Sequence, residues 1–265
     1  MKKIVIMFAM LLVANSVFAF DTFTHQTVSS ITERYLTDKA KREVQDILQS
    51  TIYKECVWVN TLRKQPEYAH TKDWHVTVLN VEGKSVTTNE NDGVVQLEKS
   101  IEVLRNRMNH SEEDVKTALR KVIHLTQDLH CLSHIYIDGY DQTRGFTFRI
   151  WDELTSKRSA SWNVNWHRQW DGAWSSRYYI FTPTYYGEDI DIYARGMKEA
   201  YSKGTPREWV EEGGRDVLYA LKDFYTGGNG DEVRVKVILQ YEYLHTKCLA
   251  KAGYRLAALL NDIFK

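Results

Sequence analysis

The stretch SEEDVKTALRKVIHLTQDLHCLSH, residues 111–134, joins the pattern of an amphipathic helix to a dense group of polar side chains. Ser111 followed by Asp114 resembles a capping box, which predicts that a helix begins there. Apolar residues then lie at helical spacing and predict a buried stripe of Val115, Ala118, Leu119, Val122 and Ile123. Three histidines and one aspartate lie between His124 and His134, so the end of this helix is a candidate metal site.

Helical spacing continues on both sides of this stretch. Upstream, an amphipathic helix is predicted by the stripe Val94, Leu97, Ile101, Leu104 and Met108. Downstream, a second stripe comprises Ile238, Tyr241, Leu244, Cys248, Ala252, Leu256 and Leu259. The segment VRVKV, residues 233–237, alternates like a strand, but we interpret it as the frayed beginning of one long closing helix that runs from Asp231.

Proline and glycine, which interrupt helices, are scarce. The 265 residues include 3 prolines and 14 glycines, which favours long helices over a many-turned β fold. No internal repeat, low-complexity tract or linker divides the sequence. The sequence therefore predicts an all-α fold, organised as a single compact multi-helix domain over residues 20–265.

Residues 1–19 differ from the rest of the chain. Lys2 and Lys3 precede the apolar run IVIMFAMLLVA, and Val17 and Ala19 occupy the small-residue positions of a cleavage site. This pattern predicts a secretory signal peptide that is cut after Ala19. A membrane anchor is disfavoured because a spanning helix needs about 20 apolar residues, more than this run supplies. We therefore expect a secreted or periplasmic monomer without a membrane anchor.

Charge and cysteine content limit the possible functions. The predicted signal contains two of the 35 basic residues and none of the 35 acidic ones, which leaves 33 basic and 35 acidic residues. A broad basic surface for nucleic acid is therefore not implied, although a local groove remains possible. The odd number of cysteines, Cys56, Cys131 and Cys248, allows at most one internal disulfide. None has CxxC spacing, which argues against a thiolate metal site.

Two histidine–aspartate pairs are the strongest chemical signal. His124 and Asp128 are four residues apart, so on a helix their side chains share one face. The same spacing returns with His167 and Asp171 in NWHRQWD. A single pair of this kind is usually structural, but two pairs with His134 beside the first favour a metal site. Imidazole and carboxylate ligands suit Zn²⁺ in a hydrolytic centre.

Two further histidines complete a recognisable order of motifs, His25 in FDTFTH and His75 in TKDWH. This order resembles the zinc-dependent single-strand-specific nucleases and 3′-nucleotidases, the nuclease S-one/P-one type, with bacterial zinc phospholipase C as distant kin. The resemblance covers essentially the whole mature chain. It implies an all-α fold with three zinc ions, one bound by the amino group and carbonyl of the mature first residue.

The resemblance assigns residues to each zinc. Cleavage after Ala19 makes His25 the sixth mature residue, where the family has a histidine, and puts Phe20 first, where tryptophan is usual. The first zinc would take His75, His124, Asp128 and Asn60. The second would take Phe20, His25 and Asp128, and the third His134, His167 and Asp171. Asn60 and Asp128 are the predicted catalytic residues. His130 is expected in the core, because on a continuous helix it projects about 160° away from His134.

The implied activity is hydrolysis of single-stranded RNA or DNA to 5′-phosphate ends, together with release of phosphate from 3′-nucleotides. Two alternatives remain open. One is a phospholipase C-like phosphodiesterase, although those relatives usually end the third zinc set with glutamate rather than Asp171. The other is a catalytically impaired zinc-holding binding protein, because Asn60 stands where the family has a zinc-bound aspartate. Asp73 would compensate if it shared the side of His75 on an extended segment.

Aromatic and basic residues offer weaker signals. Trp162, Trp166, Trp170 and Trp174 are spaced by four, which favours packing between helices over substrate contact. The segment RYYIFTPTYYG, residues 177–187, has five aromatic residues. It is a possible surface for stacking bases, although packing between helices is the favoured interpretation. Arg63 and Lys64 are expected to be solvated rather than bound to phosphate.

Overall fold

The computed structural model describes residues 20–62, 65–152, 157–158, 164–227 and 231–265. The predicted signal peptide with its cleavage point, the basic pair Arg63 and Lys64, and Trp162 lie outside the described residues.

Helices form most of the described chain, which confirms the all-α prediction. The longer ones are α1 (Thr22–Arg34), α2 (Asp38–Leu48), α5 (Gly93–Arg105), α6 (Glu112–Asp128), α8 (Pro183–Ala194), α10 (Pro206–Phe224) and α11 (Val235–Ile263). The short ones are α3 (Ile52–Glu55), α4 (Trp58–Leu62), α7 (Trp166–Arg168) and α9 (Lys198–Tyr201). The 3₁₀ helices are η1 (Pro66–His75), η2 (Arg107–Asn109), η3 (Leu132–His134), η4 (Asp141–Arg144), η6 (Ser175–Tyr178) and η7 (Arg195–Met197). The segment η5 (Gln169–Ala173) is a short π-helix.

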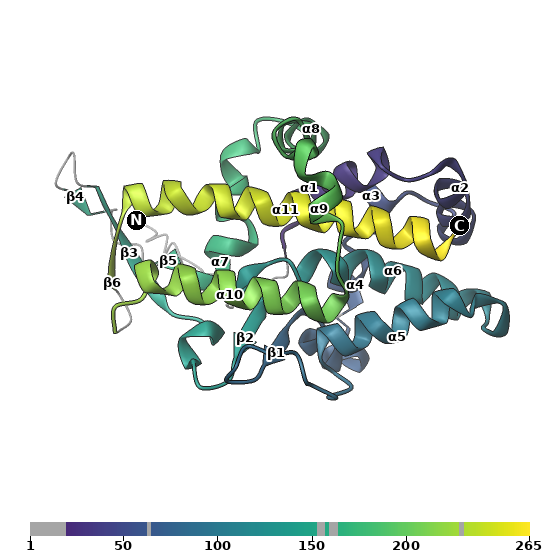
Figure 1. Ribbon diagram of the computed structural model, residues 1–265, viewed down its shortest axis with the longest axis horizontal. Coiled ribbons are helices and arrows are strands. Elements are labelled where there is room, and N and C mark those ends of the chain that lie inside the picture. The colour runs from purple at the N-terminus through teal and green to yellow at the C-terminus, as the bar shows by residue number, and fades with distance from the viewer. Residues whose placement is uncertain (1–19, 63–64, 153–156, 159–163, 228–230) are drawn as a thin grey trace, which may run out of the picture.

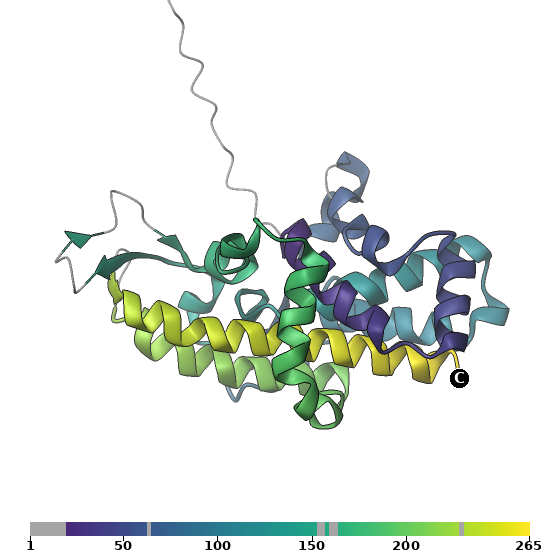
Figure 2. The same cartoon turned by 90° about the horizontal axis from the view of Figure 1, so that it is seen from above.

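The long helices pack around one hydrophobic core. Helices α10 and α11 run along the long axis of the molecule, and α8 crosses α11 near its middle (Figures 1 and 2). Helix α11 contacts α1, α6 and α8, so it links the N-terminal helix to the helix that carries the first histidine–aspartate pair. At Gly253 a Cβ would lie 2.6 Å from the Ile31 side chain, so a glycine is needed where α11 meets α1.

Two small sheets are added to this helical frame. Strands β1 (Thr77–Leu79) and β2 (Ile135–Ile137) pair in parallel, with Thr77 opposite Ile135. The second sheet lies at the opposite end of the molecule from α2 (Figure 1). In it, β3 (Thr147–Asp152) pairs antiparallel with β4 (Lys157–Arg158) and β5 (Val164–Asn165), and parallel with β6 (Asp231–Arg234).

The helix predicted from residues 111–134 is present but shorter than expected. Ser111 caps it, with its Oγ accepting from the Asp114 N–H at 3.1 Å, and the predicted apolar stripe is buried. The helix ends at Asp128, and a turn leads to η3. The continuous helix used to orient His130 was therefore wrong. His130 is nevertheless buried, as expected, with its Nδ1–H donating to the Thr126 carbonyl at 2.6 Å.

Three other expectations need correction. Met108 is not in the buried stripe: α5 ends at Arg105, and Met108 is 92% exposed. The closing helix begins at Val235 rather than at Asp231, because residues 231–234 pair with β3 instead of fraying from the helix. Asp73 is exposed on η1, which is not extended, so it does not share the side of His75.

The aromatic segments behave in two different ways. Trp166, Trp170 and Trp174 are buried against one another, with ring centroids 5.4 and 4.6 Å apart, which confirms the packing interpretation for these three. The segment 177–187 is mixed. Tyr186 is buried, whereas four other apolar or aromatic residues of the segment are exposed: Tyr179, Ile180, Phe181 and Tyr185.

Candidate metal centre

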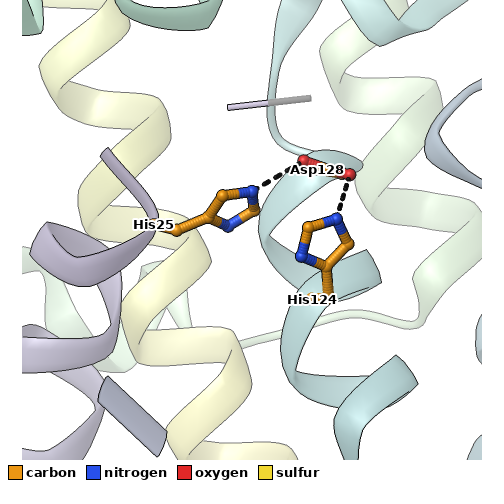
Figure 3. A group of neighbouring side chains, drawn as sticks. All are labelled: His25, His124 and Asp128. Carbon is orange, nitrogen blue, oxygen red and sulfur yellow. Dashed lines mark ion pairs between the residues drawn. The ribbon is translucent and has the colours of Figure 1, made fainter. Parts of the chain in front are cut away.

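The first cluster forms where α1 meets the end of α6. Asp21 caps α1, with its carboxylate accepting from the Thr24 N–H at 2.7 Å, and this start of the helix presents His25 inward. His124 and Asp128 lie one turn apart on α6, as their spacing predicts. Figure 3 shows the His25 and His124 rings pointing at the Asp128 carboxylate from two different helices.

His75 reaches the same carboxylate from η1. Strand β1 begins two residues after His75, and β2 begins directly after His134, so the β1–β2 pairing holds these two segments side by side. The N-terminus of α5 also packs closely here. A Cβ on Gly93 would lie 2.4 Å from the Trp74 carbonyl oxygen, and the Gly93 N–H donates to the Val76 carbonyl at 2.8 Å.

The two oxygens of Asp128 face different histidines. Its Oδ2 lies 2.6 Å from His75 Nδ1 and 2.9 Å from His124 Nε2, while its Oδ1 lies 3.4 Å from His25 Nε2. All four side chains are buried. Burial would raise the pKa of Asp128, but the neighbouring histidines hold it well below its usual range, so the carboxylate is an anion.

The outer hydrogen bonds of two of these histidines select a tautomer. His25 Nδ1–H donates to Gln127 Oε1 at 2.7 Å, and His124 Nδ1–H donates to the Cys56 carbonyl at 2.6 Å. Each Nε2 therefore carries a lone pair directed at Asp128. Burial lowers the pKa of His25 to about 3, so a proton does not occupy its Nε2 at neutral pH. A lone pair facing a buried carboxylate repels it unless a proton or a metal cation lies between them.

A second cluster forms from the segments after α6 and around η5. His134 Nε2 lies 3.0 Å from Asp171 Oδ1, and His167 Nε2 lies 3.3 Å from Asp171 Oδ2. His134 Nδ1–H donates to the Asp128 carbonyl at 3.2 Å, which links this cluster to the first. Burial would raise the pKa of Asp171, but His134 lowers it, so this carboxylate is also an anion.

Phe20 lies between the two clusters. Its buried ring contacts the rings of His25 and His134, with centroids 5.9 and 6.3 Å away. The Asp21 N–H donates to the Asp171 carbonyl at 3.3 Å, which ties this N-terminal segment to the second cluster. The Phe20 ring therefore contacts one histidine of each cluster, and the residue next to Phe20 is bonded to the second cluster.

Asn60 is carried by α4, which packs against α6 and η1. Its side chain is half-buried, and its Oδ1 is fully buried with no hydrogen-bond partner among the described residues. An amide oxygen in this state is a neutral potential ligand.

Sequence reasoning missed several residues around these clusters. Cys131 was set aside for lack of CxxC spacing, yet its Sγ lies 3.4 Å from Asp171 Oδ1. The feature of the sequence that could have identified Cys131 is its position three residues before His134. Burial raises the pKa of this thiol well above its usual range. Gln127 and the Cys56 carbonyl, which orient His25 and His124, were missed because neither has a sequence pattern of its own.

The donor atoms of both clusters suit a divalent metal such as zinc. Among the residues that the structure describes, two groups have ligand atoms that all lie within 4.8 Å of one another: His25 with His124 and Asp128, and Cys131 with His134 and Asp171. His25 Nε2, Asp128 Oδ1 and His134 Nε2 are buried without hydrogen-bond partners among the described residues. Buried imidazole nitrogens and carboxylate oxygens in this state, together with the nearby Cys131 thiol, fit the ligand preferences of zinc.

Comparison with known proteins identifies the family of this chain. Within the described ranges, no helix is both long and apolar enough to cross a membrane. A search of curated proteins returned no match. Residues 21–265 match the family described as S1/P1 Nuclease, whose members are metal-dependent and act on nucleic acid. The chain therefore belongs to the S1/P1 nuclease family and is a nuclease-type phosphoesterase.

Proposed function

We propose that this protein is a secreted zinc enzyme that cuts single-stranded RNA and DNA to 5′-phosphate products and dephosphorylates 3′-nucleotides. The observation that carries the proposal is the Asp128 carboxylate, whose two oxygens face separate histidines, with a second histidine–carboxylate cluster one hydrogen bond away. Membership of the S1/P1 nuclease family supports the class of substrate.

Three zinc ions are assigned to these residues. His75, His124 and Asp128 hold the first, with Asn60 as a neutral fourth ligand. Asp128 also binds the second zinc ion, together with His25 and the amino group and carbonyl of Phe20, which becomes the first residue after cleavage following Ala19. His134, His167 and Asp171 hold the third. Residues 20–265 then form one catalytic domain, and we expect it to act as a monomer.

The protein side chains supply orientation and charge. Zinc, when bound, activates water and neutralises charge on a phosphoryl group. Gln127 and the Cys56 carbonyl fix the tautomers of His25 and His124, so both nitrogens that face Asp128 are ready to bind without rearrangement. The buried Asp128 anion balances positive charge at the centre of the site.

Exposed aromatic residues in segment 177–187, which follows His167 and Asp171 in the chain, support a preference for unstacked bases. Phe181 and Tyr185 stack with centroids 4.7 Å apart, and both are exposed. The hydroxyl of Tyr179 donates to the Asp21 carboxylate, next to Phe20. A flexible single strand can lay a base on such a surface, whereas bases in a duplex remain stacked on each other.

The test is to assay purified, zinc-replete protein on single-stranded RNA and on 3′-AMP, with its N-terminal residue and metal content determined. We expect Phe20 at the N-terminus, about three zinc ions per chain, and hydrolysis of both substrates. A zinc-replete protein that is inert on both would overturn the proposal. Activity on a phosphocholine lipid without nuclease activity would favour the phospholipase-like alternative.

A further inference from the structure

Cys131 lies directly against the second cluster. Its Sγ is 3.4 Å from Asp171 Oδ1, and its thiol, the His134 ring and the Asp171 carboxylate all offer atoms within 4.8 Å of one another. Cys131 is 1% exposed, His134 is 0% exposed and Asp171 is 5% exposed. The sulfur atom therefore faces this cluster and not solvent.

The turn after α6 is what brings the sulfur into place. The Cys131 N–H donates to the Asp128 carbonyl, and the His134 N–H donates to the Cys131 carbonyl, each at 2.9 Å. These bonds fold residues 128–134 so that the Cys131 and His134 side chains converge on Asp171. His134 Nδ1–H donates to the Asp128 backbone carbonyl. Its buried Nε2 has no hydrogen-bond partner among the described residues and lies 3.0 Å from Asp171 Oδ1.

We propose that Cys131 is a ligand of the metal ion held by His134, His167 and Asp171. This inference rests on the proposed function, because it assumes that an ion is bound there. As the metal–sulfur bond forms, the S–H bond breaks and its proton leaves to solvent, so the ligand is the thiolate.

Charge and ligand count give the inference a specific consequence. The thiolate and Asp171 together carry two negative charges against the two positive charges of the ion. Two histidines, one cysteine and one aspartate make four ligands, the number that closes a tetrahedral zinc site. The close pair of ions, by contrast, shares the single carboxylate of Asp128. The ion beside Cys131 is therefore the one most resistant to removal by a chelator.

Cobalt substitution tests the inference without relying on activity. The mature protein is stripped of metal and loaded with Co²⁺, which gives a near-ultraviolet sulfur-to-cobalt charge-transfer band only when a thiolate is a ligand. We expect the band in the unmodified protein, its loss in Cys131→Ser, and its retention in the matched control Cys248→Ser. Cys248 is also a buried free cysteine, but it lies on α11 outside both clusters.

Each outcome has a defined meaning. A cobalt-loaded, unmodified protein that shows visible ligand-field bands but no charge-transfer band overturns this inference and leaves the zinc enzyme intact. A band that persists in Cys131→Ser also overturns it. Failure to bind cobalt overturns both proposals. A band that depends on Cys131 in a protein that hydrolyses no nucleic acid supports the thiolate ligand and overturns the proposed activity. Where Cys131→Ser does not fold, a band that persists in both Cys56→Ser and Cys248→Ser assigns the thiolate to Cys131, the third cysteine, and loss of the band in either variant overturns the inference.

Discussion

Asp128 organises the site at the scale of single residues. It is a buried anion whose Oδ1 and Oδ2 face histidines from α1, η1 and α6. Such a group is stable in the interior only when positive charge or hydrogen bonds compensate it. The surrounding imidazoles provide this compensation, either as hydrogen-bond donors or by holding a cation between their lone pairs and the carboxylate.

Substitution Asp128→Asn tests this role. The amide keeps the shape of the side chain but removes its negative charge. We expect turnover of single-stranded RNA to fall about 10³-fold, because weaker metal binding would remove several kcal/mol of transition-state stabilisation. Metal content should fall as well. Asp191→Asn is the control, because Asp191 is a buried carboxylate that accepts from Tyr35 and Tyr254 away from the clusters. Equal metal content in the two variants would contradict the assignment.

Substitution Asn60→Asp adds a charge where the chain has a neutral amide. In the part of the chain that the structure describes, the buried Asn60 Oδ1 has no hydrogen-bond partner, so a carboxylate there would meet the same surroundings with one more negative charge. We expect affinity for the first zinc to rise on the order of tenfold, measured by competition with a chelator. A large accompanying gain in rate would show that the natural site is impaired. Unchanged affinity would mean that Asn60 is not a ligand.

Helix α6 and the turn that follows it set the positions of His124, Asp128 and His134 at the scale of elements. The Ser111 cap and the buried stripe hold the helix, and its end at Asp128 releases the chain to reach the second cluster. Pairing of β1 with β2 then places His75 beside this turn. The site therefore lies where the end of α6, the turn that follows it and the paired strands β1 and β2 come together.

Substitution Ser111→Ala removes the cap of α6. We expect the free energy of unfolding to fall by about 1 kcal/mol, because one N–H at the start of the helix loses its acceptor. Ser111→Asp, which keeps an acceptor oxygen, is the control and should remain close to the unmodified protein. Both are measured by urea denaturation. Metal content should not change in either variant, since Ser111 lies at the far end of α6 from Asp128.

Helix α11 ties the site to the rest of the molecule. It carries Arg255, which donates to His130 Nε2 at 2.9 Å and pairs with Glu212 on α10, so it supports the turn after α6 from behind. It also carries His245, buried against Phe20 and Trp174 and accepting from or donating to Ser175 Oγ at 3.2 Å. Because His245 is buried and can titrate, it makes the free energy of unfolding depend on pH.

His245 should weaken the fold in acid. Burial lowers the pKa of His245 from 6.5 to about 3, although Asp171 opposes the shift. Below pH 6.5, therefore, His245 is protonated in the unfolded chain but remains neutral in the folded chain. Stability is therefore full above pH 6.5 and falls as the pH drops toward 3. Between pH 7 and 5 this histidine contributes a loss of about 2 kcal/mol.

Urea denaturation of the metal-free protein at both pH values measures this loss. In His245→Gln the decrease in unfolding free energy from pH 7 to 5 should be smaller by that amount. Other histidines titrate alike in both proteins, so their effects cancel in the comparison. An identical decrease in the two proteins would show that His245 does not titrate in this way.

Local parts of the site were predictable from sequence, and the distant ones were reached only through the family resemblance. The pairs His124–Asp128 and His167–Asp171 follow from spacing, because residues four apart share a helix face. The end of α6 and the start of α11 were mispredicted for one reason: periodicity shows that a helix exists but not where tertiary contacts end it. Asp231–Arg234 is a strand because β3 supplies its partners.

The sequence by itself determined the helices, their buried stripes and the two histidine–aspartate pairs, since these depend on backbone geometry over a few residues. Only the tertiary structure decided that His75 meets Asp128 across 53 residues of chain, and that Cys131 faces Asp171. Such contacts depend on how the whole core packs and on the register of β1 against β2. Packing of distant segments leaves no period in the sequence. Cys131, which the absence of CxxC spacing argued against as a ligand, was therefore found beside Asp171 only once the chain was folded.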